Sequence, residues 1–227
     1  MLADFLEIVD DLVRDAAQWV TPAQRDRAVG LALARYSKDR PRELVEDVVV
    51  ADGVQIPLPT AWAQGASDLR TVECPVVTPP VPLDSACWYI YRTPLGEQIG
   101  LVSAVTPGTT ARVAYSGLHL LTDTDDTIPA DHLEAVACYA ASLLAEQVAT
   151  VHANSSDSTI SADSVDRSHP AREWAARAKS YRNRYFTTLG IEINAQGVEQ
   201  PRMEAAGVVV DMELPSTTGR GRLYRRG

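Results

Sequence analysis

The spacing of apolar residues changes twice along this chain, and these changes constrain its fold more than any single motif. Before residue 41 and after residue 128, apolar residues recur every three or four positions, which predicts helices. Between them, residues 42–120 contain short valine- and tyrosine-rich runs separated by glycine and proline, which is typical of antiparallel strands. We therefore predict an α+β fold, in which a small antiparallel β unit is inserted between the second and third helices of a four-helix bundle, with an extended C-terminal arm.

The helical segments have recognisable ends. The first stripe of apolar residues runs from Leu2 to Val20, and a capping box formed by Thr21 and Gln24 opens the second helix. Because only Thr21 separates the two patterns, we expect a tight helical hairpin. The second helix should end before Pro41, since a residue that precedes proline avoids the helical region. Two more helices are expected at about residues 129–153 and 170–189, the last with Gly190 as its C-terminal cap.

The β unit should hold about six strands, and two turn signals predict hairpins within it. Asp52-Gly53 and Pro94-Leu95-Gly96 are both flanked by strand-like runs. The expected organisation is a discontinuous helical domain of residues 1–41 and 121–190, an inserted β domain of residues 42–120, and a C-terminal extension of residues 191–227. Within this extension, residues 208–210 form a further candidate strand.

The charge of the chain is divided unevenly. The net charge is −9, and removing the four arginines of the last nine residues leaves −13 for residues 1–218. A terminal block of like charge is typical of an interaction segment. A solvated end without a role is the alternative, because chain termini are often loose. An acidic body repels DNA phosphate, so we do not expect its main surface to grip a duplex.

A search for catalytic chemistry finds no convincing motif. The four histidines are scattered, and neither a phosphate-binding loop nor a nucleophile elbow is present. We predict surface histidines, no metal, no cofactor and no enzymatic activity. The three cysteines are widely spaced without a CxxC pair, which favours free thiols. No run of 18 apolar residues occurs, so no membrane partner is expected.

Two groups of side chains are candidates for contacts between subunits. Trp62 lies in a proline- and glycine-bounded loop, where it either covers the junction of the bundle with the β unit or contacts a neighbouring subunit. The fourth helix carries a basic side that includes Arg177, Arg182 and Arg184, which could pair with acids of an adjacent subunit.

Several segments resemble the head–tail adaptor (connector) proteins of tailed phages. They are Leu33–Arg42 (LARYSKDRPR), Leu58–Trp62 (LPTAW), Val113–His119 (VAYSGLH), Ile160–Asp166 (ISADSVD) and Ala178–Tyr185 (AKSYRNRY). The resemblance implies a structural virion protein of the neck, between the capsid portal and the tail, that is made in the host cytoplasm. It also implies a ring of identical subunits, commonly a dodecamer, that docks on the portal protein and contacts the next neck or tail component. Double-stranded DNA would pass through the lumen without sequence-specific binding.

In related adaptors the C-terminal segment reaches into the portal, which here corresponds to Ser216–Gly227. The candidate portal-binding residues are Arg220, Arg222, Leu223, Tyr224, Arg225 and Arg226. Two other functions stay open at this point. One is a small hydrolase or lyase with an unrecognised site, and the other is a nucleic-acid-binding module that acts through the arginine tail.

Overall fold

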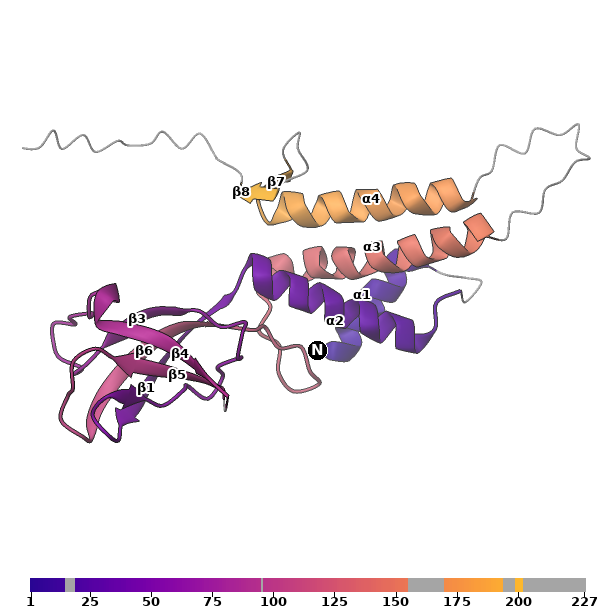
Figure 1. Ribbon diagram of the computed structural model, residues 1–227. Coiled ribbons are helices and arrows are strands. Elements are labelled where there is room, and N and C mark those ends of the chain that lie inside the picture. The colour runs from indigo at the N-terminus through magenta and orange to yellow at the C-terminus, as the bar shows by residue number, and fades with distance from the viewer. Residues whose placement is uncertain (15–18, 95, 155–169, 194–198, 202–227) are drawn as a thin grey trace, which may run out of the picture. The chain divides into compact units, whose positions relative to one another are not determined.

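The computed structural model describes residues 1–14, 19–94, 96–154, 170–193 and 199–201. The chain divides into two compact units, Met1–Tyr185 and Phe186–Gly227. The architecture is mixed: four helices and, in the first unit, two three-stranded antiparallel sheets are found among the described residues. Figure 1 shows the helices α1 (Leu2–Val13), α2 (Pro22–Asp39), α3 (Ala130–Asn154) and α4 (Pro170–Thr188).

Helix α1 is shorter than its apolar pattern predicts. It ends at Val13 because Arg14 takes a left-handed conformation (φ 45°) and donates its N–H to the carbonyl of Asp10 at 2.8 Å, which closes the helix. The expected tight hairpin through Thr21 alone is therefore wrong. Phe5, Val9 and Val13 form the buried stripe of α1.

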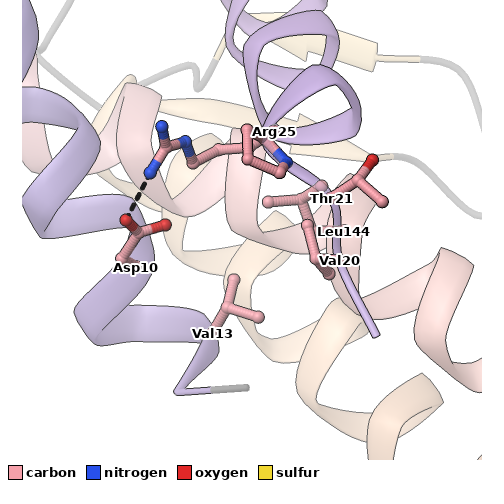
Figure 2. Close-up of a pocket in the computed structure, with 7 residues that line it drawn as sticks. Asp10, Val13, Val20, Thr21, Arg25 and Leu144 are labelled. Carbon is pink, nitrogen blue, oxygen red and sulfur yellow. Dashed lines mark hydrogen bonds and ion pairs between the residues drawn. The ribbon is translucent and has the colours of Figure 1, made fainter. Parts of the chain in front are cut away.

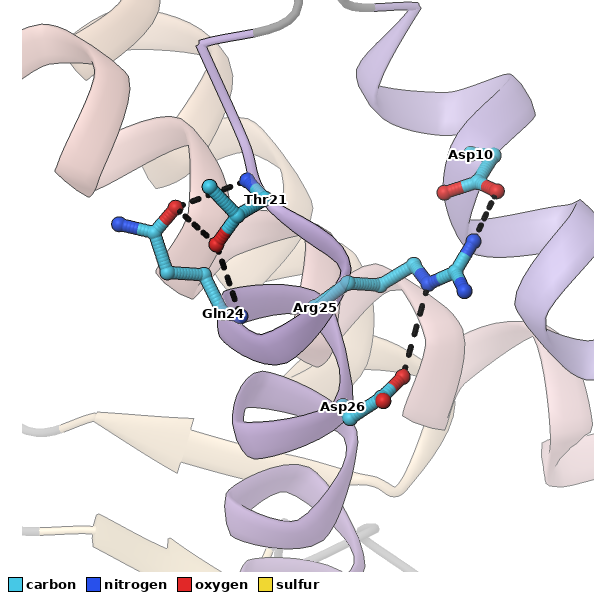
Figure 3. A network of polar contacts seen from close by, with 5 residues as sticks. All are labelled: Asp10, Thr21, Gln24, Arg25 and Asp26. Atoms are coloured by element: carbon cyan, nitrogen blue, oxygen red, sulfur yellow. Dashed lines mark hydrogen bonds and ion pairs between the residues drawn. The ribbon is translucent and has the colours of Figure 1, made fainter.

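Helix α2 begins and ends where the sequence indicates. The Thr21 hydroxyl accepts from the Gln24 amide at 3.3 Å, and the Gln24 side chain accepts from the Thr21 N–H at 2.8 Å. Figure 3 shows this reciprocal capping box at the start of the helix. At the other end, α2 stops at Asp39 before Pro41, as predicted.

Helix α3 lies at the centre of the helical part. Helices α1 and α2 both pack against it. Between residues 135 and 145 it is buried on nearly all sides, mostly through alanine. Small side chains allow neighbouring helices to approach closely, so this segment can take partners on several faces. Helix α4 is joined to the others by hydrogen bonds, such as that from the Tyr181 hydroxyl to the Leu12 carbonyl at 2.7 Å.

The β unit consists of two sheets with the strand orders β1-β6-β3 and β2-β5-β4. The strands are β1 (Arg42–Val50), β2 (Gln55–Ile56), β3 (Leu69–Glu73), β4 (Trp88–Thr93), β5 (Gly96–Leu101) and β6 (Thr109–Gly117). Side chains from both sheets form one hydrophobic core that includes Val50, Ile56, Val72, Ile99 and Val113.

The two predicted hairpins have different outcomes. Strands β4 and β5 pair antiparallel up to Thr93 and Gly96, so the second hairpin is confirmed. The first is wrong, because β1 pairs along its whole length with β6, whereas β2 pairs with β5. Asp52-Gly53 therefore marks a real turn that carries the chain from one sheet to the other.

The second unit contains a short hairpin that the sequence did not indicate. Strands β7 (Ile191–Ile193) and β8 (Glu199–Pro201) pair antiparallel. Gly190 precedes β7 with a φ of 65°, which confirms the predicted glycine cap of α4. The candidate strand at 208–210 lies outside the described residues.

Candidate functional site

His119 has a structural role, which corrects the expectation of surface histidines for this residue. His119 is buried, its Nε2 lies 2.9 Å from the Arg40 carbonyl, and its Nδ1 lies 2.9 Å from the Thr127 carbonyl. Its Nδ1 lies 3.1 Å from the Thr127 hydroxyl. The backbone N–H of His119 also donates to the Ser37 hydroxyl at 3.0 Å. This side chain therefore ties the end of α2 to the segment before α3.

No catalytic constellation is found in the part of the chain that the structure describes. Those residues hold no cluster of three His, Cys, Asp or Glu side chains able to bind a metal ion. Cys74, Cys87 and Cys138 are free thiols, and burial raises the pKa of the Cys74 and Cys138 thiols. None of the helices among these residues is long and apolar enough to cross a membrane.

Two surface hollows of the described residues differ in size and in the charges that line them. The smaller hollow has a volume of about 260 Å³, and the two charged residues in its lining, Asp10 and Arg25, form an ion pair at 2.5 Å. Figure 2 shows this pair beside Val13, Val20 and Leu144. A larger groove of about 750 Å³ runs between α2 and the β unit, and its lining includes Leu33, Leu118 and His119. The lining of this groove also includes Asp68 and Lys38. Its two serine hydroxyls are hydrogen-bonded to backbone: Ser37 donates to the Leu33 carbonyl at 2.8 Å, and Ser116 accepts from the Asp68 N–H at 2.7 Å.

Trp62 is held within the β unit. Its ring packs against the hydrophobic core and lies 5.8 Å from the ring of Tyr115, and its indole N–H donates to the carboxylate of Glu97 at 3.0 Å. The same carboxylate accepts from the Gly65 N–H at 3.2 Å and from Arg92 at 3.1 Å. Trp62 thus fixes its own loop, and its contact with a neighbouring subunit stays a prediction.

We expect Glu97 to make stability depend on pH in the acid range. Its hydrogen bonds, first that from Trp62, hold the pKa of Glu97 below its ordinary value of 4.5. A lowered pKa in the folded state adds stability above the unfolded value, and this contribution is lost as pH falls through the folded pKa. Urea unfolding of wild type and Glu97→Gln between pH 7 and pH 2.5 should show a smaller acid loss in the variant. An equal loss of unfolding free energy at acid pH in the two proteins would contradict this role.

The basic side of α4 is engaged with the chain's own helices. Arg182 pairs with Glu146 and Arg184 pairs with Glu134, each at 2.6 Å, and both acids lie on α3. The Arg177 guanidinium lies 4.9 Å from the centre of the Trp174 ring. The sequence did not predict these pairs, because the pattern of one helix does not show which acidic side chains of another helix lie opposite it. The proposed pairing with an adjacent subunit remains untested.

The candidate portal-binding residues, from Arg220 to Arg226, lie outside the described residues.

Two edge strands with exposed apolar side chains are the main feature that sequence reasoning missed. In β4, the exposed fractions of Tyr89, Ile90 and Tyr91 are 49 %, 38 % and 58 %. In β1, those of Val45 and Val49 are 65 % and 54 %. A strand with exposed apolar side chains at a sheet edge is a template for pairing with another chain. The apolar run at 88–91 predicted a strand, but nothing in it indicates that its faces lie uncovered.

Comparison with known proteins gives distant structural neighbours. No protein-family model matches the chain, and no curated protein matches it. The chain is similar to the neck of an empty GTA particle computed with C6 symmetry (15 % identity, covering 80 % of this chain and 88 % of that chain, TM-score 0.28). It is also similar to the neck of a native GTA particle computed with C12 symmetry (16 % identity, 76 % and 86 % covered, TM-score 0.28).

A third neighbour is the virion of a native gene transfer agent (GTA) particle, with 14 % identity, 80 % and 88 % covered, and a TM-score of 0.26.

Proposed function

We propose that this chain is a structural subunit of a virion neck. It is a head–tail adaptor that forms an oligomeric ring, docks on the portal, extends the DNA channel and contacts the next neck or tail component. The observation that carries the proposal is the pair of apolar edge strands, β1 and β4, on different sheets of one subunit. A head-to-tail contact needs two different complementary surfaces, and repeating such a contact around an axis closes a ring.

The sequence resemblance and the charge distribution support the same role. The quoted adaptor-like segments are distributed from Leu33 to Tyr185. With a net charge of −13 in residues 1–218, the subunit offers DNA few sites for counterion exchange, so a duplex could slide past it with little affinity.

The direct test is co-assembly with the portal from the same particle. The purified chain and portal are mixed and separated by sedimentation, and the mass of the complex is measured. We expect many copies of the chain on each portal, because ring contacts and portal contacts reinforce one another. A portal that sediments with none of the chain, at concentrations where both are soluble, would contradict the proposal.

The C-terminal arm gives a second prediction. Deleting Ser216–Gly227 should leave the circular dichroism and thermal unfolding of the chain unchanged but weaken portal binding at least about tenfold, since several contacts with charged groups would be lost. A variant with the four arginines of the arm replaced by glutamine keeps its length and removes its charge. Binding by both variants at wild-type strength would refute the role of the arm and leave the ring proposal standing.

A further inference from the structure

We propose that neighbouring copies join by pairing strand β4 of one subunit with strand β1 of the next, which makes a sheet that is continuous across the contact. The inference rests on the proposed ring and names its subunit contact. It concerns two strand edges and the side chains beside them.

Strand β4 has the features of an edge that a partner covers. It is the last strand of the order β2-β5-β4. Proteins protect such edges with charged side chains, proline, bulges or a covering segment, and in β4 the charged residue Arg92 lies near the end of the strand. Within β4, the run Tyr89-Ile90-Tyr91 has none of these features, and its register with β5 is regular from Trp88 to Thr93. An edge of this kind in a soluble protein calls for a partner strand.

The backbone of β4 has hydrogen-bonding groups available for that partner. The N–H of Val102 donates to the Cys87 carbonyl at 2.9 Å, which places Cys87 and Val102 in a hydrogen-bonded pair. Such pairs alternate along an antiparallel ladder. The backbone N–H and C=O groups of residues 89, 91 and 93 therefore point toward β5, and those of residues 88, 90 and 92 point away from it, in the plane of the sheet. The N–H and C=O groups of Trp88, Ile90 and Arg92 thus lie on the open edge.

Strand β1 is the edge best able to receive β4. It is the outer strand of the order β1-β6-β3, and it pairs with β6 over nine residues. The other edges are poorer: β2 has only two residues, and on β3 the Val72 carbonyl already accepts the N–H of Leu83 at 2.7 Å. With nine residues, β1 is long enough to pair with all six residues of β4.

The side chains of the two strands are complementary. Val45 and Val49 share the exposed face of β1, and aromatic side chains opposite β-branched ones stabilise neighbouring strands. Tyr89 and Tyr91 would supply these aromatic partners.

A contact between two β4 strands fits these facts less well. It would be isologous, so it would stop at a dimer. A β4-to-β1 contact leaves one free β1 edge and one free β4 edge on every partial assembly. It can therefore continue until the ring closes.

Disulfide trapping on the portal tests the contact. In a Cys87→Ser background, Tyr91→Cys is combined with Val45→Cys in one variant and with Val49→Cys in another, because the register between subunits decides which valine lies opposite. Facing residues of adjacent strands have the Cα separation that a disulfide needs. Oxidation of the portal-bound protein should give a ladder of covalent dimers, trimers and larger species in at least one variant.

Two controls make the result specific. Tyr91→Cys combined with Val77→Cys places the second thiol on an exposed loop residue that belongs to neither strand, and it should give no ladder. Ile90→Pro removes an outward N–H at an edge, where proline is compatible with a strand. It should keep the far-ultraviolet circular dichroism of the wild type and weaken assembly at least about 30-fold, the loss expected for a central contact residue.

The outcomes separate this inference from the proposed function. Many copies on the portal without a ladder in either variant, or with only covalent dimers, would overturn the β4-to-β1 contact and leave the adaptor proposal intact. Failure of the wild-type chain to bind the portal would overturn both.

Discussion

Replacing Gly53 with alanine should lower the free energy of unfolding by about 4 kcal/mol, which combines the cost of a left-handed alanine with that of a steric clash. Gly53 has a φ of 82°, and an added Cβ would lie 2.4 Å from the carbonyl oxygen of Val105. The clash is with backbone, and that backbone is fixed because the Val105 N–H donates to the Gly53 carbonyl at 2.8 Å. The turn that links the two sheets therefore cannot move aside without losing this hydrogen bond.

Gly108→Ala provides the matched control for this prediction. Gly108 has nearly the same φ, 86°, but nothing lies within 4 Å of an added Cβ. It should cost only the conformational part, roughly 1–2 kcal/mol. Urea unfolding followed by circular dichroism measures both variants. Equal losses would show that the contact with Val105 does not hold the turn.

Replacing Asp39 with alanine should cost about 3 kcal/mol, because it removes one partner from a largely buried charge pair and one acceptor from a buried hydroxyl. The Asp39 carboxylate is 9 % exposed and accepts from Arg35 at 2.6 Å and from the Tyr185 hydroxyl at 2.7 Å. Burial, and then the hydrogen bond to Asp39, raise the pKa of Tyr185 above its usual value. Asp39 therefore links the end of α2 to α4.

Glu134→Ala is the control for Asp39, since it removes a different ion pair of α4. Glu134 and Arg184 are both more than half exposed, so their pair should contribute less than about 1 kcal/mol. Thermal unfolding of the two variants should separate them clearly. A loss for Glu134→Ala as large as that for Asp39→Ala would contradict the assigned importance of the buried contact.

Sequence patterns located the elements where a local signal exists. The capping box at Thr21 and Gln24 and the position of Pro41 set the ends of α2, because both act through neighbouring backbone groups. The turn at Asp52-Gly53 is also local: the Asp52 side chain accepts from Val54 and Gln55 at 3.0 and 2.8 Å. These features were predictable from residues a few positions apart.

Pairing and exposure were not predictable in the same way. Strand β1 pairs with β6 rather than with β2. This pairing depends on a hydrophobic core that is formed by segments far apart in the chain. His119 is buried for a similar reason, because its carbonyl partner Arg40 belongs to a distant segment. The edges of β1 and β4 are exposed because no other segment of the described chain pairs with them. The pattern of residues within a strand does not show whether another segment will cover it.

Electron microscopy of the chain bound to its portal tests the central claim most directly. The account predicts a closed ring of identical subunits seated on the portal, with an open channel along the common axis. A chain that stays as separate monomers beside a bare portal, or that binds it as one asymmetric copy, would contradict the claim that this protein works as a ring subunit.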